Sequence, residues 1–391
     1  MRNTSKSRGG RAALMVAHCA GMVDLVALPV WVGTLIARYG FDPQQAGGLV
    51  TLFLAGAVLA SVTVAPRFDR LPRRVLAPAM FGTAAVLFFA CSKVTGFPAL
   101  AALHALAGVA GGTALSITHG TAGRTDNPHR LFGFMQTALG VFGVAFMAAV
   151  PPMIQNAGGP VLFLVFAGVM LVAFLIAAAA FPGEVHAGAD QAEEPVLPAA
   201  GWPRHVWYGI LGISCMALTQ AMVFSFLERI GIERGFGAGR VQALLIALGL
   251  VNLVPGALAA FLQRRLDPRK VVLSGAILQA ALACVLALTT AFAPYAGAGA
   301  LFVAIMIFTH VFAFGLLSQL DPSGRAVSAT PAMLMVGGAI GPILGGTLVK
   351  FAGYPALGVA ALVVDGIAIA LFARLMQPVG AAAEATAPAS R

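Results

Sequence analysis

Long apolar runs occupy most of this chain, and they constrain its fold more than any other feature. A run of about 20 apolar residues crosses the hydrocarbon core of a bilayer as a helix. Twelve such runs are present, at residues 12–36, 46–65, 74–92, 98–119, 131–154, 160–181, 204–228, 242–263, 270–291, 297–318, 328–350 and 355–376. They lack the ten-residue alternation of β-barrel strands. The sequence therefore predicts an all-α membrane protein with twelve transmembrane helices.

The composition supports a lipid environment. Charged residues make up 10% of the chain and hydrophobic residues 59%, whereas soluble proteins have roughly 25% charged residues. The net charge of +10 does not indicate a nucleic-acid partner, because the basic residues gather in short loops between the apolar runs. The four cysteines lie far apart inside apolar runs, and the dispersed histidines make a poor metal site. We expect no metal or other cofactor, and a monomer in the lipid bilayer.

The distribution of Lys and Arg predicts the orientation, since cytoplasmic loops carry an excess of both. With the N-terminus inside, six of the 24 basic residues fall on the outer side. These six are Arg38, Lys93, Arg229, Arg234, Arg240 and Lys350. We therefore expect a multi-pass protein of the cell inner (plasma) membrane with both termini cytoplasmic.

The chain divides into two similar halves. Residues 182–203 are rich in Pro, Gly and acidic residues, which is typical of a linker, and they separate six spans from six. LPRR at 71–74 and DPRK at 267–270 both follow the second span of their half. The expected division is an N-terminal six-helix bundle over 1–181, a cytoplasmic linker over 182–203, a C-terminal bundle over 204–376 and a disordered tail over 377–391. Pseudo-symmetric bundles of this kind enclose a cavity that opens alternately to each side.

Three motifs resemble signatures of the major facilitator superfamily. APRFDRLPRR at 65–74 resembles the loop signature G-x-x-x-D-R-x-G-R-R between spans 2 and 3. GGAIGPILGG at 337–346 is similar to the glycine–proline signature of drug/proton antiporters, although here it lies in span 11 rather than span 5. LHALAGVAGG at 103–112 resembles the span-4 signature, with His104 in place of the usual arginine. The resemblance implies a twelve-span transporter closest in pattern to the drug/proton antiporter-like members.

The same resemblance implies a set of gating residues, namely Asp69, Arg70, Arg73, Arg74, Gly341 and Pro342. Asp69 would meet the start of span 11, and the arginines would bridge to the other half when the inner side is closed. The glycines of 337–346 would form a packing seam and Pro342 a hinge. Two alternatives remain open: an ordinary positive-inside loop at 66–74, and a static tight interface at 337–346.

Ionisable groups within a membrane are costly and therefore mark function. Asp24 lies midway along the first span, where loss of water makes it a candidate proton carrier. His104 in span 4 could exchange protons with it. Asp365 lies midway along span 12, where we expect a structural role.

Polar and aromatic residues in cavity-lining spans form the predicted substrate site. They are His18, Gln136, Gln220, Phe224, Asn252 and His310. Amide groups with aromatic walls suit a mainly apolar ligand. No Lys or Arg lies midway along a span, which disfavours a multiply charged anion as substrate.

The sequence has no catalytic or nucleotide-binding motif, so it does not predict an enzyme. We expect a secondary transporter that exports small lipophilic or weakly cationic compounds in exchange for protons. The alternative is proton-coupled import of a monocarboxylate, nucleoside or other small metabolite, with Arg38 or Lys350 reaching into the pocket. A third class, a sensor or scaffold without transport, is disfavoured because the 67–74 cluster is largely intact.

Overall fold

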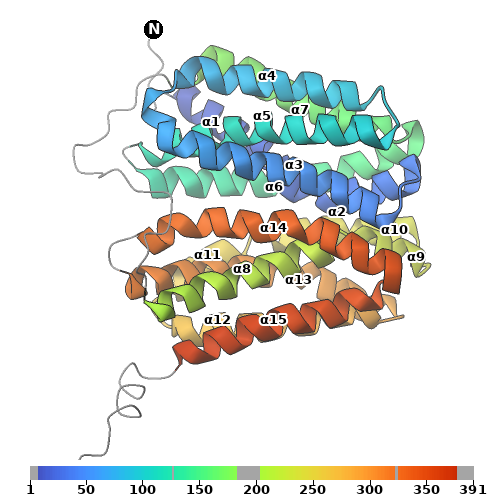
Figure 1. The fold of residues 1–391 in the computed structure, drawn as a ribbon, viewed down its shortest axis with the longest axis vertical. Helices are drawn as coiled ribbons and strands as arrows, with labels where there is room; N and C mark the ends of the chain where they lie inside the picture. Colours follow the sequence, from blue (N-terminus) through green and yellow to red (C-terminus); the bar gives the residue numbers. More distant parts are fainter. Residues whose placement is uncertain (1–7, 126, 183–202, 322–324, 377–391) are drawn as a thin grey trace, which may run out of the picture.

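The computed structural model describes residues 8–125, 127–182, 203–321 and 325–376 (Figure 1). Within these ranges the regular structure is helical, and twelve helical segments are long and apolar enough to cross a membrane. The predicted all-α class and the number of spans are therefore confirmed. Most of the predicted linker and the whole predicted tail lie outside the described residues.

The first half contains seven α-helices and one short 3-10 helix. They are α1 (Arg8–Gly21), α2 (Val23–Tyr39), α3 (Pro43–Val64), η1 (Ala65–Arg70), α4 (Arg73–Cys91), α5 (Phe97–Gly123), α6 (Pro128–Ala157) and α7 (Pro160–Ala180).

The second half contains eight helices. They are α8 (Arg204–Phe224), α9 (Leu227–Glu233), α10 (Ala238–Val251), α11 (Pro255–Leu262), α12 (Pro268–Leu288), α13 (Phe292–Leu320), α14 (Arg325–Ala352) and α15 (Pro355–Leu375).

Three spans are each divided into two helices. α1 and α2 form the first span with a break at Met22, while α8 and α9 form the seventh and α10 and α11 the eighth. The seventh span thus continues to Glu233, whereas the sequence analysis ended it at Glu228. This extension places Glu228 and Arg229 inside a span, although the sequence analysis placed Glu228 at its end and Arg229 beyond it.

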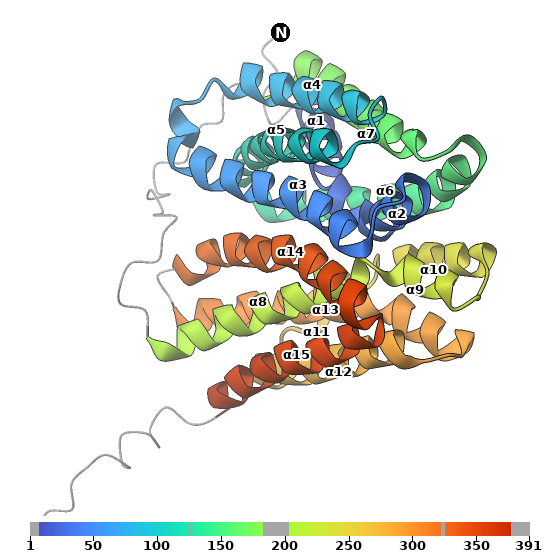
Figure 2. The same ribbon diagram turned by 45° about the vertical axis from the view of Figure 1, so that its right-hand side comes forward.

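The two halves lie one against the other, with α1–α7 on one side and α8–α15 on the other (Figures 1 and 2). α3 and α14 run side by side at the boundary. In the first half, the buried Trp31 packs edge-on against Phe53, Phe88 and Phe166. Large apolar side chains such as Val75 and Phe351 are exposed, as expected for a surface whose solvent is lipid.

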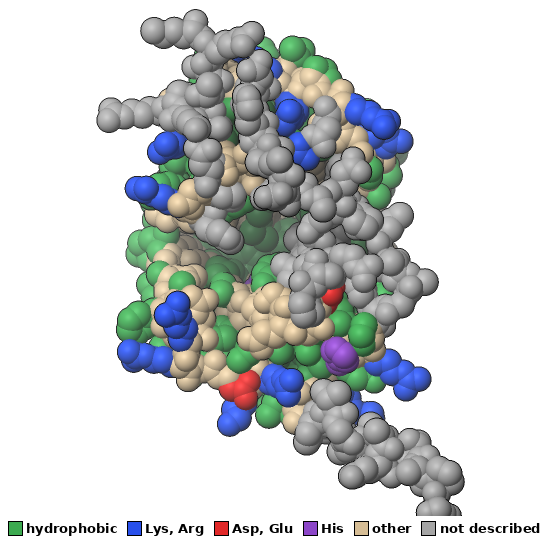
Figure 3. All heavy atoms as spheres, turned by 90° about the vertical axis from the view of Figure 1, so that its left-hand side faces the viewer, with side chains coloured by type: hydrophobic (Ala, Val, Ile, Leu, Met, Phe, Trp, Pro, Cys, Tyr) green, Lys and Arg blue, Asp and Glu red, His purple; other side chains and the backbone are tan. Residues whose placement is uncertain are grey.

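The two ends of the bundle differ. We call the end where α1 begins and α15 finishes the Arg8 end, and the end where α2 leads into α3 the Asp42 end. Figure 3 looks onto the Arg8 end, where the surface between the halves is hollowed and hydrophobic side chains line its visible part. Contacts between the halves gather toward the Asp42 end, as described below. The structure is therefore open at the Arg8 end.

Two glycines allow the backbones of α3 and α14 to touch. A Cβ atom added at Gly47 of α3 would overlap the carbonyl oxygen of Pro342 in α14. Reciprocally, a Cβ atom at Gly346 of α14 would overlap the carbonyl oxygen of Pro43 in α3. Small residues permit this close approach of helices in lipid, where dispersion contacts rather than water drive association.

We predict that Gly47→Ala weakens the contact between the halves. The added methyl group must push the two backbones apart, and overpacking of this kind costs about 1–3 kcal/mol. The measurement is the thermal unfolding midpoint of the purified protein in detergent, compared with that of Gly366→Ala. Gly366 has no heavy atom within 4 Å of its added Cβ, so this control should retain the wild-type midpoint. Equal midpoints for both variants would contradict the prediction.

Candidate functional site

The hydroxyl group of Thr51, in the middle part of α3, joins the two halves. It donates a hydrogen bond of 2.7 Å to the Ala339 carbonyl and accepts one of 3.2 Å from the Ile343 N–H. These two backbone groups are the pair that closes an ordinary turn of α14. Because Pro342 lies within this turn and has no N–H group, the helix is locally weakened. A side chain from the first half thus supports the backbone of the second half at the predicted hinge.

A second set of contacts closes the Asp42 end. The Lys350 ammonium group lies 2.9 Å from the Asp42 carboxylate and donates to the Gln44 side chain at 3.2 Å. Partial burial acts to raise the pKa of Asp42, but the hydrogen bond from the Gln45 N–H and the Lys350 charge outweigh it, so this pKa is lowered. Both side chains are about one-third exposed, and an exposed pair of this kind contributes little to stability.

We predict that Thr51→Val shifts the protein toward a state open at the Asp42 end. Valine has a similar shape but cannot bond to α14, and an unsatisfied buried backbone group costs about 1–3 kcal/mol. The measurement is the distance between spin labels at Thr95 and Thr290 in a cysteine-free background, because both residues are exposed near the Asp42 end.

Thr51→Ser is the matched control, since serine retains the hydroxyl group. It should keep the wild-type distance distribution, whereas Thr51→Val should add a longer distance. If Thr51→Ser opened the Asp42 end as far as Thr51→Val, the hydroxyl group would not be the cause.

The predicted glycine–proline motif packs against both halves. Gly337, Gly341 and Gly345 lie on one face of α14 and contact α8, where a Cβ atom at Gly341 would lie 2.6 Å from that of Ala221. Pro342 is buried and faces Gly47 of α3. Gly341 therefore packs within the second half, and Pro342 at the boundary. A gating role for either residue remains a prediction.

The predicted gating loop is anchored within the first half by an aromatic residue. Phe68 of η1 is 7% exposed, and the Arg73 and Arg124 guanidinium groups lie 4.8 and 4.6 Å from its ring centre. Arg70 and Arg74 are exposed at the Arg8 end. The side chain of Asp69 and those of residues 325–333 lie outside the described structure, so the predicted contact of Asp69 with span 11 stays a prediction.

A hydrogen-bonded chain brings together two of the predicted substrate residues. His18 of α1 bonds through Nε2 to the Gln136 amide oxygen at 3.0 Å and through Nδ1 to His119 Nε2 at 2.9 Å. Gln136 lies one turn from Gly140, whose added Cβ atom would meet Leu253 of the other half. This network therefore lies on the face of the first half that meets the second. No sequence pattern pairs His119 with His18 across 101 residues.

The two predicted proton-coupling residues occupy different surroundings. Asp24 is half-buried in the first turn of α2, directly after the break at Met22. His104 is completely buried and donates from Nδ1 to the Leu100 carbonyl at 2.7 Å, and its ring centre lies 5.4 Å from that of Trp31. Among the described residues, no hydrogen bond joins His104 to Asp24.

The second half contributes polar side chains whose hydrogen-bonding atoms have no protein partner. Both amide atoms of Gln220 in α8, Oδ1 of Asn252 after α10, and Nε2 of His310 in α13 are buried without a partner among the described residues. Phe224, one turn after Gln220, is buried, and the centre of the His310 ring lies 4.3 Å from that of Phe314, with the two rings tilted by 44°. Buried polar groups are normally satisfied, so these atoms are available to a ligand or to water.

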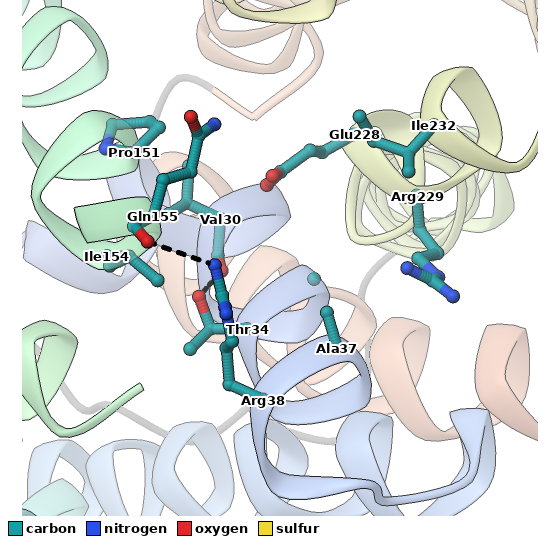
Figure 4. Close-up of a pocket in the computed structure, with 11 residues that line it drawn as sticks. Val30, Thr34, Ala37, Arg38, Pro151, Ile154, Gln155, Glu228, Arg229 and Ile232 are labelled. Atoms are coloured by element: carbon teal, nitrogen blue, oxygen red, sulfur yellow. Dashed lines mark hydrogen bonds between the residues drawn. The ribbon is translucent and has the colours of Figure 1, made fainter. Parts of the chain in front are cut away.

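A pocket of about 140 Å³ lies between the halves at the Asp42 end. Its lining residues come from α2, α6 and α9, and Figure 4 shows that the Glu228 side chain points from α9 toward α2 and α6. Oε2 of Glu228 is buried and has no hydrogen-bond partner among the described residues. The sequence analysis missed Glu228 because it ended the span at this residue. The available signal was about one further turn with the apolar residues Ile230 and Ile232.

The described residues contain no cluster of His, Cys, Asp or Glu that could hold a metal ion. The cysteines are free thiols. Asp365 is completely buried in α15, which packs against α8 and α12 within the second half.

Comparison with known families identifies this architecture. Residues 13–323 match the family model of the Major Facilitator Superfamily. The chain belongs to this superfamily. As a superfamily member it is a multi-pass membrane transporter of small molecules rather than an enzyme. A search of curated proteins finds no significant match.

Solved structures of superfamily transporters share the fold at low sequence identity. The nucleoside transporter NupG superposes with a TM-score of 0.74 at 14% identity, covering 94% of this chain and 99% of its own. A bacterial homologue of the human lysosomal transporter Spinster, in an inward-facing and occupied conformation, gives a TM-score of 0.70 at 15% identity. That match covers 94% of this chain and 95% of the homologue.

Proposed function

We propose that this transporter exports small lipophilic or weakly cationic compounds in exchange for protons, as the drug/proton antiporter-like members do. The single observation that carries the proposal is Asp24. Its carboxyl group lies at the break of the first span, in the half-buried first turn of α2. The opening at the Arg8 end has apolar walls (Figure 3). A carboxyl group in such surroundings can hold either a proton or a cationic substrate, and this competition couples the two fluxes.

The remaining residues take supporting roles in this proposal. The Arg8 end is the cytoplasmic end, so the described state faces inward and takes up substrate from the cytoplasm. The unpaired polar atoms of Gln220, Asn252 and His310 orient the substrate, and Phe224 forms an apolar wall. The network of Gln136, His18 and His119 provides a path for protons between Asp24 and the cytoplasm, because each imidazole ring can donate a hydrogen bond from one nitrogen and accept at the other. His104 then acts on Asp24 indirectly, through the packing of Trp31 in α2.

A second candidate is proton-coupled import of a nucleoside or another uncharged metabolite. The unpaired amide groups of Gln220 and Asn252 favour it, because they match the hydrogen-bonding edges of such a molecule. The fold similarity to a nucleoside transporter is compatible with this candidate. A monocarboxylate is less well supported, since Lys350 is paired with Asp42 and Arg38 with the Gln155 carbonyl at the closed end.

We predict that Asp24→Asn abolishes proton-driven transport and leaves the amount of protein in the membrane unchanged. Asparagine keeps the size of the side chain but cannot exchange a proton. The measurement is substrate-dependent proton flux in proteoliposomes with an imposed pH gradient. Asp267→Asn is the control, because Asp267 is an exposed N-cap of α12 and asparagine caps equally well. Normal coupling in Asp24→Asn would refute the role of Asp24.

We predict that ligand stabilisation separates the two candidates. A ligand that binds the folded state raises the melting temperature by mass action. Lipophilic cations, neutral aromatic compounds, nucleosides, monocarboxylates and sugars would be compared at about pH 6 and about pH 8 by thermal shift in detergent. Stabilisation by cations or neutral aromatics, stronger at the higher pH, is expected for the exporter. Stabilisation by nucleosides or carboxylates, stronger at the lower pH, would favour the importer instead.

A further inference from the structure

The pocket at the Asp42 end contains a carboxyl group that the proposed cycle has not yet used. Glu228 belongs to α9 of the second half, and the pocket wall opposite belongs to α2 and α6 of the first half (Figure 4). A carboxyl group at this boundary is covered while the Asp42 end is closed. It would be exposed to water when the halves separate there.

Gly33 of α2 shows how tightly the carboxyl group fits. A Cβ atom added at Gly33 would lie 2.9 Å from Oε2 and 3.2 Å from the carboxyl carbon of Glu228. Any larger side chain at position 33 would therefore collide with Glu228 unless one of the two moved. The Glu228 carboxyl group thus forms a close contact between the first and seventh spans at this end.

The nearest cations are engaged elsewhere. Arg229 pairs with Glu233 at 2.8 Å, and its side chain points away from Glu228 in Figure 4. Arg38 of α2 donates to the Gln155 backbone carbonyl at 3.4 Å. Neither guanidinium group forms an ion pair with Glu228 among the described residues.

The other helices packed against α9 bring no ion-pair partner for Glu228 among the described residues. On α13, the Tyr295 hydroxyl group donates to the Leu227 carbonyl. On α10, Arg240 lies over the Phe292 ring at 5.6 Å. Following α9, Arg234 donates to backbone carbonyls at the end of α12. On α12 itself, Cys284 donates to the Gly358 carbonyl.

An ionised carboxylate buried without a partner is costly, and binding of a proton removes that cost. We propose that Glu228 is a proton-binding site of the outer side, and that the bound proton allows the Asp42 end to close. The negative charge of the ionised form draws water into the pocket and favours separation of α2 from α9. The site rests on the proposed function, because its ligand is the coupling proton.

With this site, two carboxyl groups bind the coupling proton at different stages of the cycle. Glu228 takes up a proton while the Asp42 end is open, and closure then follows. Asp24, in the first turn of α2 beside the α1–α2 break, then releases the proton toward the Arg8 end. Proton uptake from outside thereby drives the transporter toward the inward-facing state that the structure describes.

The experiment measures opening of the Asp42 end without any substrate. Thr34→Cys, in a background with the four native cysteines replaced, places a thiol on the pocket wall at a position that is 5% exposed. The measurement is the rate at which a membrane-impermeant maleimide labels Thr34→Cys. This rate is divided by the labelling rate of Thr95→Cys, an exposed position, and the resulting labelling ratio is free of the pH dependence of the reagent. With Glu228 present, we expect this ratio to rise about threefold or more between about pH 6 and about pH 8.

Glu228→Gln mimics the protonated carboxyl group and should give a low ratio that does not change with pH. Glu233→Gln, on the same helix but 43% exposed at its side chain, should retain the pH dependence. Retention of the full pH dependence in Glu228→Gln would overturn the proposal. A change in the labelling ratio when NaCl replaces choline chloride at constant pH would also overturn it, because the site would then bind sodium.

Gly33→Ala tests the same contact if Glu228→Gln does not fold. Its methyl group displaces the carboxyl group, so the labelling ratio should be high at both pH values. Gly168→Ala, with no heavy atom within 4 Å of the added Cβ, should match the unsubstituted protein. A low, pH-dependent ratio in Gly33→Ala would overturn the proposal. Labelling requires no transport, so the two proposals can be told apart. The Glu228 proposal can fail while Asp24-dependent coupling persists, and Asp24-dependent coupling can fail while the Glu228 labelling result stands.

Discussion

The contact between the backbones of α3 and α14 is the constraint on which the rest of the structure depends. Gly47 and Gly346 let the two helices touch, and the Thr51 hydroxyl group completes the hydrogen bonding of α14 beside Pro342. In lipid, no hydrophobic effect holds two apolar helices together, so close packing and hydrogen bonds must do so. This boundary is narrow and lies between two otherwise self-contained helix bundles, which is the geometry a rocking motion requires.

The polar groups near the boundary between the halves differ between its closed end and its open end. At the closed Asp42 end, Asp42 and Lys350 pair directly, while Glu228 is covered without a partner. Toward the open Arg8 end, His18 bonds to both Gln136 and His119 across three helices. Between these ends, Gln220, Asn252 and His310 retain unused hydrogen-bonding atoms. The proposed cycle assigns these unsatisfied groups to the substrate and the proton, whereas Asp42 and Lys350 hold the two halves together.

The breaks within the spans could not be predicted from the sequence. They matter for the candidate site because Asp24 and Glu228 lie just after two of them. Hydropathy assigned residues 204–228 to one helix, yet the chain turns at Ser225 and continues as α9 to Glu233. Apolar residues continue through the break, with Phe224 before it and Phe226 and Leu227 after it, so a hydropathy window does not detect it. The same holds at Met22, directly before Asp24. The network of His18 was equally hidden, because its partners are more than 100 residues away in the chain.

The sequence by itself determined that the chain is a twelve-span helical membrane protein of two halves. The physical reason is that backbone groups in lipid must be bonded within their own segment, so the length and apolarity of each run decide its structure locally. Only the tertiary structure decided which end is closed, that Thr51 inserts into the turn at Pro342, and that Glu228 faces Gly33. These features depend on how helices from different halves meet, and such contacts join residues whose separation along the chain leaves no local pattern.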